Sequence, residues 1–258
     1  MAVIAPPTLD DLGVQGCFGL AALLTAQARR IAVSPTRRLT LAYLHPLRQL
    51  GVIDAPWPEA RWELEPAAEE TPIEQMQWRY RWPDYQRDGL LQTLEEFLQS
   101  IPMDEYGIAC RLRLWQDLVI AEAEQFFESQ LLKYHLEGSW AHDLTFAVRE
   151  HRLELPIAQW RYCCWAATRF AAAQAQRLRG DTSAPGLREE MYAELKRRAQ
   201  RLVSGDWSNC AFMPFHLRPE SAAGRLLTTT LSPLGALYWQ CVPSAEVLLI
   251  PRQKTSAN

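Results

Sequence analysis

Apolar residues recur at the spacing of an α-helix over most of this chain. The spacing predicts helices at about residues 9–30, 34–50, 84–99, 107–136, 140–151, 156–179, 187–204, 220–230 and 233–241. Thr8 precedes the first of them, and Asp10 and Asp11 lie in its first turn, where a carboxylate interacts favourably with the helix dipole. Glycines stand just after three later helices, as is usual at helix ends. The pattern predicts a mainly α-helical fold.

Residues 34–53, SPTRRLTLAYLHPLRQLGVI, form the helix on which the function hypotheses depend. Ser34 followed by Pro35 predicts its start, Gly51 predicts its end, and Pro46 predicts an interruption of its last part. One face holds four large apolar side chains, Leu39, Tyr43, Leu47 and Leu50. The opposite face holds Arg37, Leu41, Leu44, His45 and Arg48. We therefore expect the first face to pack on the core and the second to lie at the surface.

Two stretches after this helix alternate between apolar and polar residues, which is the period of a β-strand. Trp62 and Leu64 alternate with charged residues in the stretch 61–65. In QMQWRYRW, residues 75–82, Met76 and three aromatic residues share one face, and glutamine and arginine share the other. Because aromatic and basic side chains lie on opposite faces, this stretch is more typical of a hairpin packed on the core than of a site for single-stranded nucleic acid. Together the two stretches predict a short β-hairpin.

The order of helix, glycine, strand, loop and strand over residues 35–82 resembles the winged-helix superfamily. The resemblance covers about a third of the chain and implies that the helix at 35–50 is a recognition helix for the major groove of DNA. Near residue 83 the spacing of apolar residues changes from that of a strand to that of a helix, and the balance of charge changes as well. We therefore expect a winged-helix-like domain at 1–82, a helical domain at 83–250 and a frayed tail at 251–258.

Length and composition predict a folded protein with reduced thiols. With 258 residues, 48% of them apolar and 22% charged, the chain is long enough to bury a core without metals or disulfides. Its start, MAVIAPPTLDD, lacks the pattern of a secretory signal, and no apolar run is long enough for a membrane span. The six cysteines include no C-x-x-C pair. We expect a cytoplasmic protein with no membrane contact, and the excess of arginine over lysine is typical of a GC-rich bacterial genome.

Charge is distributed unevenly along the chain, although the formal net charge is only −3. Residues 12–53 contain five arginines and no acidic residue, whereas residues 54–105 contain thirteen acidic and four basic residues. A basic segment followed by an acidic one makes a surface for nucleic acid or for an acidic partner worth testing. The side chains that would contact double-stranded DNA are Arg37, Arg38, His45 and Arg48. Leu41 and Leu44 favour a protein interface or a second packed layer instead, because an exposed leucine gains little from the polar edges of bases.

Candidate chemistry is sparse. The sequence contains no nucleophile elbow, zinc-protease motif or nucleotide fingerprint. Glu122 shares a helical stripe with aromatic residues, so it is a carboxyl group of raised pKa, the partner of an arginine from the helix at 156–179, or a side chain that reaches water.

The pair His142-Asp143 also occurs in helical metal-dependent phosphohydrolases, but the further His and Asp of those enzymes have no convincing counterpart here. Cys163-Cys164 has the surroundings of buried apolar residues. We predict no catalytic residue, no metal site and no cofactor.

These observations lead to three hypotheses. The first is a non-enzymatic DNA-binding regulator or adaptor, whose helical domain mediates assembly. The second is a protein-interaction subunit of a multi-protein complex, for example a defence or toxin-neutralising system, which binds a protein partner or a second copy of the chain and no DNA. The third is a helical metal-dependent phosphohydrolase.

Overall fold

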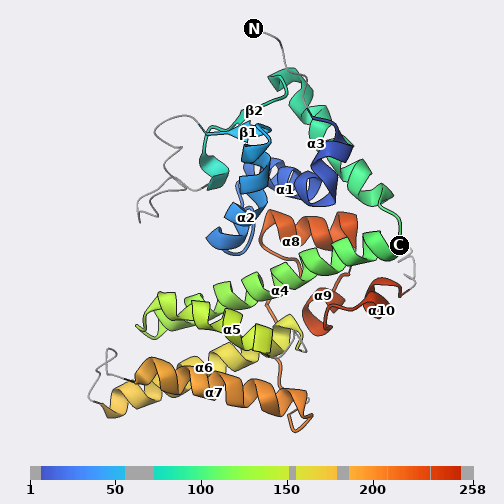
Figure 1. The fold of residues 1–258 in the computed structure, drawn as a ribbon. Coiled ribbons are helices and arrows are strands. Elements are labelled where there is room, and N and C mark those ends of the chain that lie inside the picture. Colours follow the sequence, from blue (N-terminus) through green and yellow to red (C-terminus); the bar gives the residue numbers. More distant parts are fainter. Residues whose placement is uncertain are drawn as a thin grey trace.

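The computed structural model describes residues 7–55, 73–150, 155–178, 186–207, 209–232 and 234–250 (Figure 1). Its helices and strands are α1 (Leu9–Arg29), α2 (Arg37–Gln49), β1 (Ile53–Asp54), β2 (Arg79–Tyr80), α3 (Asp84–Ser100), α4 (Glu105–Lys133), α5 (Asp143–Glu150), α6 (Ile157–Arg177), α7 (Leu187–Val203), α8 (Ala222–Leu226), α9 (Leu237–Gln240) and α10 (Ala245–Leu248). Short 3-10 turns span Ile73–Gln75 and Gly138–His142, and a π-helical turn, Leu227–Leu231, continues α8. The prediction of a mainly helical fold is confirmed.

The first helix begins where its sequence predicts. The Thr8 side chain accepts a hydrogen bond from the Asp11 amide at 3.2 Å, and the Thr8 amide donates to the Asp11 carboxylate at 2.9 Å. This reciprocal pair satisfies two backbone donors that a helix start otherwise leaves open. α1 ends at Arg30, which adopts the left-handed conformation with φ of 52°.

The second helix departs from the expected boundaries. Its cap is Thr36, not Ser34, because the Ser34 hydroxyl is buried and donates to the Thr36 carbonyl at 2.8 Å. The helix also continues through Pro46 to Gln49, so the predicted interruption is wrong. A proline this close to the end of a helix removes only one of its last backbone hydrogen bonds.

The hairpin is shorter than predicted. β1 pairs with β2 in antiparallel register, with Ile53 opposite Tyr80. The predicted strand at 61–65 lies outside the described residues, as does the predicted tail at 251–258. Within the stretch 75–82, Met76, Trp78 and Trp82 are buried, which confirms that this aromatic face packs on the core.

α1 and α4 organise the two halves of the fold. In Figure 1, α2, α3 and α8 pack around α1, and α4 crosses beneath this group and contacts α5 and α6. α7 packs against α6 at the far end. A continuous hydrophobic cluster runs from Leu12 to Leu248. Helices from both sides of the predicted domain boundary at 82/83 share this core, and the boundary itself stays a prediction.

Two sets of hydrogen bonds connect distant parts of the chain. The amides of Ala222 and Ala223 at the start of α8 donate to the carbonyls of Ala32 and Val33, each at 2.9 Å. Arg111 on α4 is buried, and its guanidinium donates to the carbonyls of Ile101, Pro102, Gly107 and Leu231 at 2.6–3.1 Å. The first set fixes the loop that leads into α2.

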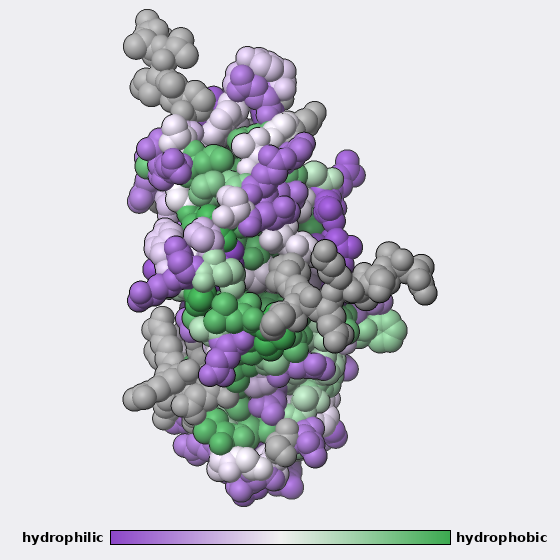
Figure 2. Space-filling model, turned by 90° about the vertical axis from the view of Figure 1, so that its right-hand side faces the viewer, coloured by the Kyte–Doolittle hydropathy of each residue, from purple (hydrophilic) through white to green (hydrophobic). Residues whose placement is uncertain are grey.

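The surface is polar with local apolar areas. On the face that carries α9 and α10, apolar side chains gather across the middle, and polar side chains cover the upper part (Figure 2). In the described segments, no helix combines the length and hydropathy needed to cross a membrane.

Candidate functional site

The basic residues predicted on α2 lie at its surface, and two of them have carboxylate partners. Arg37, Arg38 and His45 are exposed, and Arg48 is half-buried. The Arg38 guanidinium donates to Glu124 on α4 at 2.6 Å and to the Thr145 hydroxyl at 3.1 Å. Arg48 pairs with Asp54 at 3.4 Å. These partners already compensate part of the positive charge of α2.

The two leucines predicted at a protein interface are placed differently. Leu44 is fully buried, and Leu41 is partly buried and packed against the core. The expected protein interface at Leu44 is wrong, and its burial agrees with the alternative of a second packed layer, because the buried stripe of α2 consists of Thr40, Tyr43, Leu44 and Leu47. Leu50, expected in the core, is 56% exposed instead.

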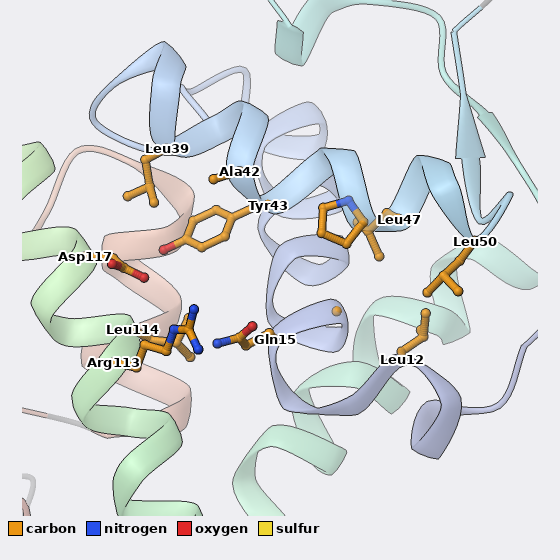
Figure 3. Close-up of a pocket in the computed structure, with 12 residues that line it drawn as sticks. Leu12, Gln15, Leu39, Ala42, Tyr43, Leu47, Leu50, Arg113, Leu114 and Asp117 are labelled. Carbon is orange, nitrogen blue, oxygen red and sulfur yellow. The ribbon is translucent and has the colours of Figure 1, made fainter.

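A groove lies between α1, α2 and α4, and we call it the α2 groove (Figure 3). Its volume is about 230 Å³. Its lining consists of Leu12, Gln15 and Gly16 from α1, Leu39, Ala42, Tyr43, Pro46, Leu47 and Leu50 from α2, and Arg113, Leu114 and Asp117 from α4. The groove is thus mostly apolar, with four polar side chains.

A glycine lets α1 approach α2 closely. A Cβ atom on Gly19 would lie 3.1 Å from the Tyr43 carbonyl oxygen, which is closer than most real Cβ contacts. The close contact holds Tyr43 at the wall of the groove.

The hydroxyl group of Tyr43 is buried, and no residue in the described part of the chain forms a hydrogen bond with it. Its ring packs edge-to-face on Phe18, with centroids 5.7 Å apart, and its side chain is only 8% exposed. Burial, and to a smaller degree the charge of Asp117, raise the pKa of Tyr43, so the phenol stays protonated. In Figure 3 the hydroxyl points toward Asp117. Buried polar atoms normally have a partner, so this one marks a position that a ligand atom could fill.

Asp117 supplies the acidic group of the groove. Burial raises the pKa of Asp117, and the nearby charge of Arg113 offsets part of this effect.

A second hollow of about 260 Å³ shares Leu39, Ala42 and Asp117 with the α2 groove and extends the groove to Ile120 and Thr145. A shallow channel therefore follows α2 along α4.

The His-Asp pair has partners within the protein. His142 Nδ1 lies 2.7 Å from Glu124, the buried carboxylate that also holds Arg38. Asp143 accepts two hydrogen bonds from the Arg188 guanidinium, at 2.7 and 2.9 Å. Within the part of the chain that the structure describes, no group of three or more His, Cys, Asp or Glu side chains could hold a metal ion.

Glu122 lies in a separate pocket on the other side of α4. Its carboxylate accepts a hydrogen bond from the Tyr238 hydroxyl at 3.2 Å. Burial raises the pKa of Glu122 to about 7, although Tyr238 and Arg161 act in the opposite direction. Arg161 belongs to α6, the helix from which the sequence predicted an arginine partner. Of the three alternatives for Glu122, the raised pKa applies. Arg161 acts on Glu122 through its charge, and the predicted ion pair with it stays a prediction.

The two adjacent cysteines are inert. Cys163 and Cys164 are fully buried in α6. Burial raises the pKa of the Cys163 thiol to about 12 and that of Cys164 well above its usual value. Their predicted placement in the core is confirmed.

Sequence reasoning did not identify the polar residues of the α2 groove. Arg113, Asp117 and Glu124 are charged residues of α4 spaced four and seven residues apart, which places all three near one face of the helix. This spacing is the feature of the sequence that points to a charged face of α4. Searches against protein-family models, curated proteins and solved structures found no match for this chain.

Proposed function

We propose that this protein is a protein-interaction subunit that binds a segment of a partner protein in the α2 groove. The observation that carries the proposal is the buried Tyr43 hydroxyl, which has no hydrogen-bond partner among the described residues and points toward Asp117 in a mostly apolar groove. A volume of about 230 Å³ suits one or two side chains of a partner rather than a drug-sized ligand. Interfaces are often anchored by such single side chains in small pockets.

The chemistry of the groove favours a basic anchor, lysine or arginine. Covering the groove removes the remaining water around Asp117, and a buried carboxylate is costly unless it has a cationic partner. A lysine or arginine has an aliphatic stem that can lie along Leu39 and Pro46, and its head group can donate to Asp117 and Tyr43 together. A single basic anchor therefore satisfies both polar groups.

Contact with DNA through α2 is the second candidate, and the exposure of Arg37, Arg38 and His45 favours it. Three carboxylates next to α2 weigh against it. Glu124 holds Arg38, Asp54 holds Arg48, and Asp117 adds a negative charge that Arg113 offsets only in part. Phosphate contacts depend on cations that are available for the backbone of the duplex. The protein-partner proposal is therefore the stronger of the two.

Selection of phage-displayed peptides on the purified full-length protein tests the proposal. We expect the enriched peptides to carry lysine or arginine next to apolar residues, and Asp117→Asn to abolish the enrichment. Tyr43→Phe should weaken the best peptide by roughly ten- to hundredfold, as expected for the loss of one hydrogen bond to a charged group. Tyr106→Phe, at an exposed tyrosine of α4 outside the groove, is the matched control. Enriched peptides without a basic residue, or with equal affinity for Asp117→Asn, would contradict the proposal.

Fluorescence anisotropy with random duplex DNA at low salt distinguishes the two candidates. The protein-partner proposal expects no binding at micromolar protein. Binding that weakens with salt, with a log–log slope of about −3 per subunit that becomes shallower by about one in Arg37→Ala, would favour DNA.

A further inference from the structure

A second pocket lies between α4, α6, α9 and the segment before α8, and we call it the Glu122 pocket. Its volume is about 410 Å³, within the usual range for small-molecule sites. Its lining combines charged and aromatic side chains: Glu122, Gln125, Phe126, Ser129, Arg161, Pro214, Phe215, His216, Arg218, Glu220 and Trp239. It shares no residue with the α2 groove.

Arg161 is held in a fixed orientation at this pocket. Its guanidinium carbon lies 4.3 Å from the centroid of the Phe126 ring and 5.6 Å from that of Trp239. Aromatic faces attract a guanidinium and keep it planar against the ring. The Nε atom of Arg161 is nevertheless buried and has no hydrogen-bond partner within the described ranges. The pocket therefore presents an oriented cation with one donor that these residues leave unused.

The charges around the pocket favour an anionic ligand. Glu122 is buried, and in its protonated form it carries no charge and can donate a hydrogen bond. Arg161 and Arg218 are then opposed by Glu220 alone. An oxyanion can accept from the guanidinium of Arg161, which matches the geometry of carboxylate and phosphate groups.

The aromatic side chains at the rim favour a planar ligand. Phe215 lines the pocket, yet its side chain is 96% exposed and touches His216 edge-to-face, with ring centroids 4.7 Å apart. A phenylalanine so exposed leaves nearly its whole apolar surface in water. A planar ligand beside Trp239 would bury that surface.

We propose that the Glu122 pocket binds a small aromatic oxyanion, whose carboxylate or phosphate accepts hydrogen bonds from Arg161 while its ring packs against Phe215 and Trp239. The groups that face Glu122 are Tyr238 on α9, Arg161 on α6 and Glu220 before α8. An anion placed beside them favours the protonated form of Glu122. Binding therefore takes up a proton near pH 7, and it weakens as the pH rises.

Isothermal titration with three probes of similar shape tests this proposal. Benzoate carries a carboxylate, phenyl phosphate carries a phosphate, and benzamidine carries the opposite charge. We expect one or both anions to bind and benzamidine not to bind, and the ratio of the two anion affinities identifies the preferred oxyanion. Binding of benzamidine alone, or of none of the probes at millimolar concentration, would overturn the proposal.

Variants of two arginines on α6 test whether Arg161 binds the anion directly. Arg161→Gln should weaken the bound anion by roughly ten- to hundredfold, as for the loss of charged hydrogen bonds. Arg161→Lys keeps the charge and should weaken it less, and either variant is used only if its far-ultraviolet spectrum is unchanged. Arg169→Gln is the matched control, since Arg169 is an exposed arginine of the same helix over Trp165, 4.9 Å from its centroid. Equal weakening by Arg169→Gln would contradict a direct role of Arg161.

The pH dependence supplies an independent readout. In the wild type, the affinity should fall as the pH rises above 7, by up to about tenfold per unit. Glu122→Gln imitates the protonated carboxyl group, so it should bind the anion at least as tightly and without this pH dependence. Loss of binding in a folded Glu122→Gln protein would show that the charged carboxylate is needed, and would overturn the proposal.

Discussion

Tyr43 and Tyr238 are two core tyrosines whose hydroxyl groups differ in hydrogen bonding. Tyr43 and Tyr238 are both buried, but Tyr238 donates to Glu122, whereas the Tyr43 hydroxyl has no partner among the residues that the structure describes. A buried hydroxyl without a partner loses its hydrogen bonds to water and gains nothing in return. The stability cost at Tyr43 is what we expect of a residue kept for binding rather than for folding.

Phenylalanine at the two positions should therefore have opposite effects. We expect Tyr43→Phe to raise the free energy of unfolding by about 1 kcal/mol, because it removes an unsatisfied polar group. Tyr238→Phe should lower it by about 1–3 kcal/mol, because it leaves the buried Glu122 without its donor. Urea unfolding of the two variants at pH 7 measures both changes. Destabilisation by Tyr43→Phe would mean that its hydroxyl has a partner.

Glu122 should make stability depend on pH. Burial raises its pKa from 4.5 to about 7, so between these values the folded protein binds a proton that the unfolded chain has released. The free energy of unfolding should therefore fall as the pH rises from 4.5 to 7, and then level off. Glu122→Gln removes this loss and should be more stable than the wild type by about 3 kcal/mol at pH 8, with little difference near pH 4.5. Urea unfolding at both pH values, with the exposed Glu128→Gln as control, checks this.

At the scale of the elements, the contact between α1 and α2 shapes the α2 groove. We expect Gly19→Ala to lower the free energy of unfolding by about 1–3 kcal/mol, because the new methyl group presses on the backbone of Tyr43. Gly89→Ala on α3 has open space around it and should raise stability by about 0.5–1 kcal/mol. Thermal unfolding of the two variants compares the same substitution with and without a neighbouring helix. A stabilising Gly19→Ala would contradict the close contact.

The local patterns predicted helix spans well and helix faces less well. The expected helices at 84–99, 156–179 and 187–204 agree with α3, α6 and α7 to within two residues at each end, since caps and periodicity are local signals. The buried face of α2 could not be assigned in the same way. Leu44 and Leu50 exchange their expected environments because the placement of α1 and α4 around α2 decides which stripe is covered.

Features of the two candidate sites that depend on contacts between helices were likewise not predictable from the sequence. The raised pKa of Glu122 could be expected from the sequence, because this carboxyl group shares a helical stripe with aromatic residues. The combination of Tyr43 with Asp117 could not, since a contact between α2 and α4 leaves no trace in the spacing within either helix. Burial of the Tyr43 hydroxyl depends on the whole arrangement of three helices.

At the scale of the molecule, α1 packs against helices from both sides of residue 82. α3 and α8 both pack on α1, and both lie beyond residue 82. We therefore expect a fragment of residues 1–82 to lack a cooperative thermal transition and to show poorly dispersed amide resonances, because the apolar surface of α1 stays in water. The full-length protein is the control. A sharp transition in the fragment would establish residues 1–82 as an independent domain.

The backbone hydrogen bonds between Ala222–Ala223 and Ala32–Val33 have a consequence for synthesis on the ribosome. The chain emerges from its N-terminus, so the loop before α2 is made long before the segment that fixes it. At typical elongation rates the delay is roughly ten to thirty seconds. During this interval the face of α1 that α8 later covers is open to other apolar surfaces. A nascent chain that stops before residue 222 thus presents an incomplete α1, which is the kind of surface that chaperones bind.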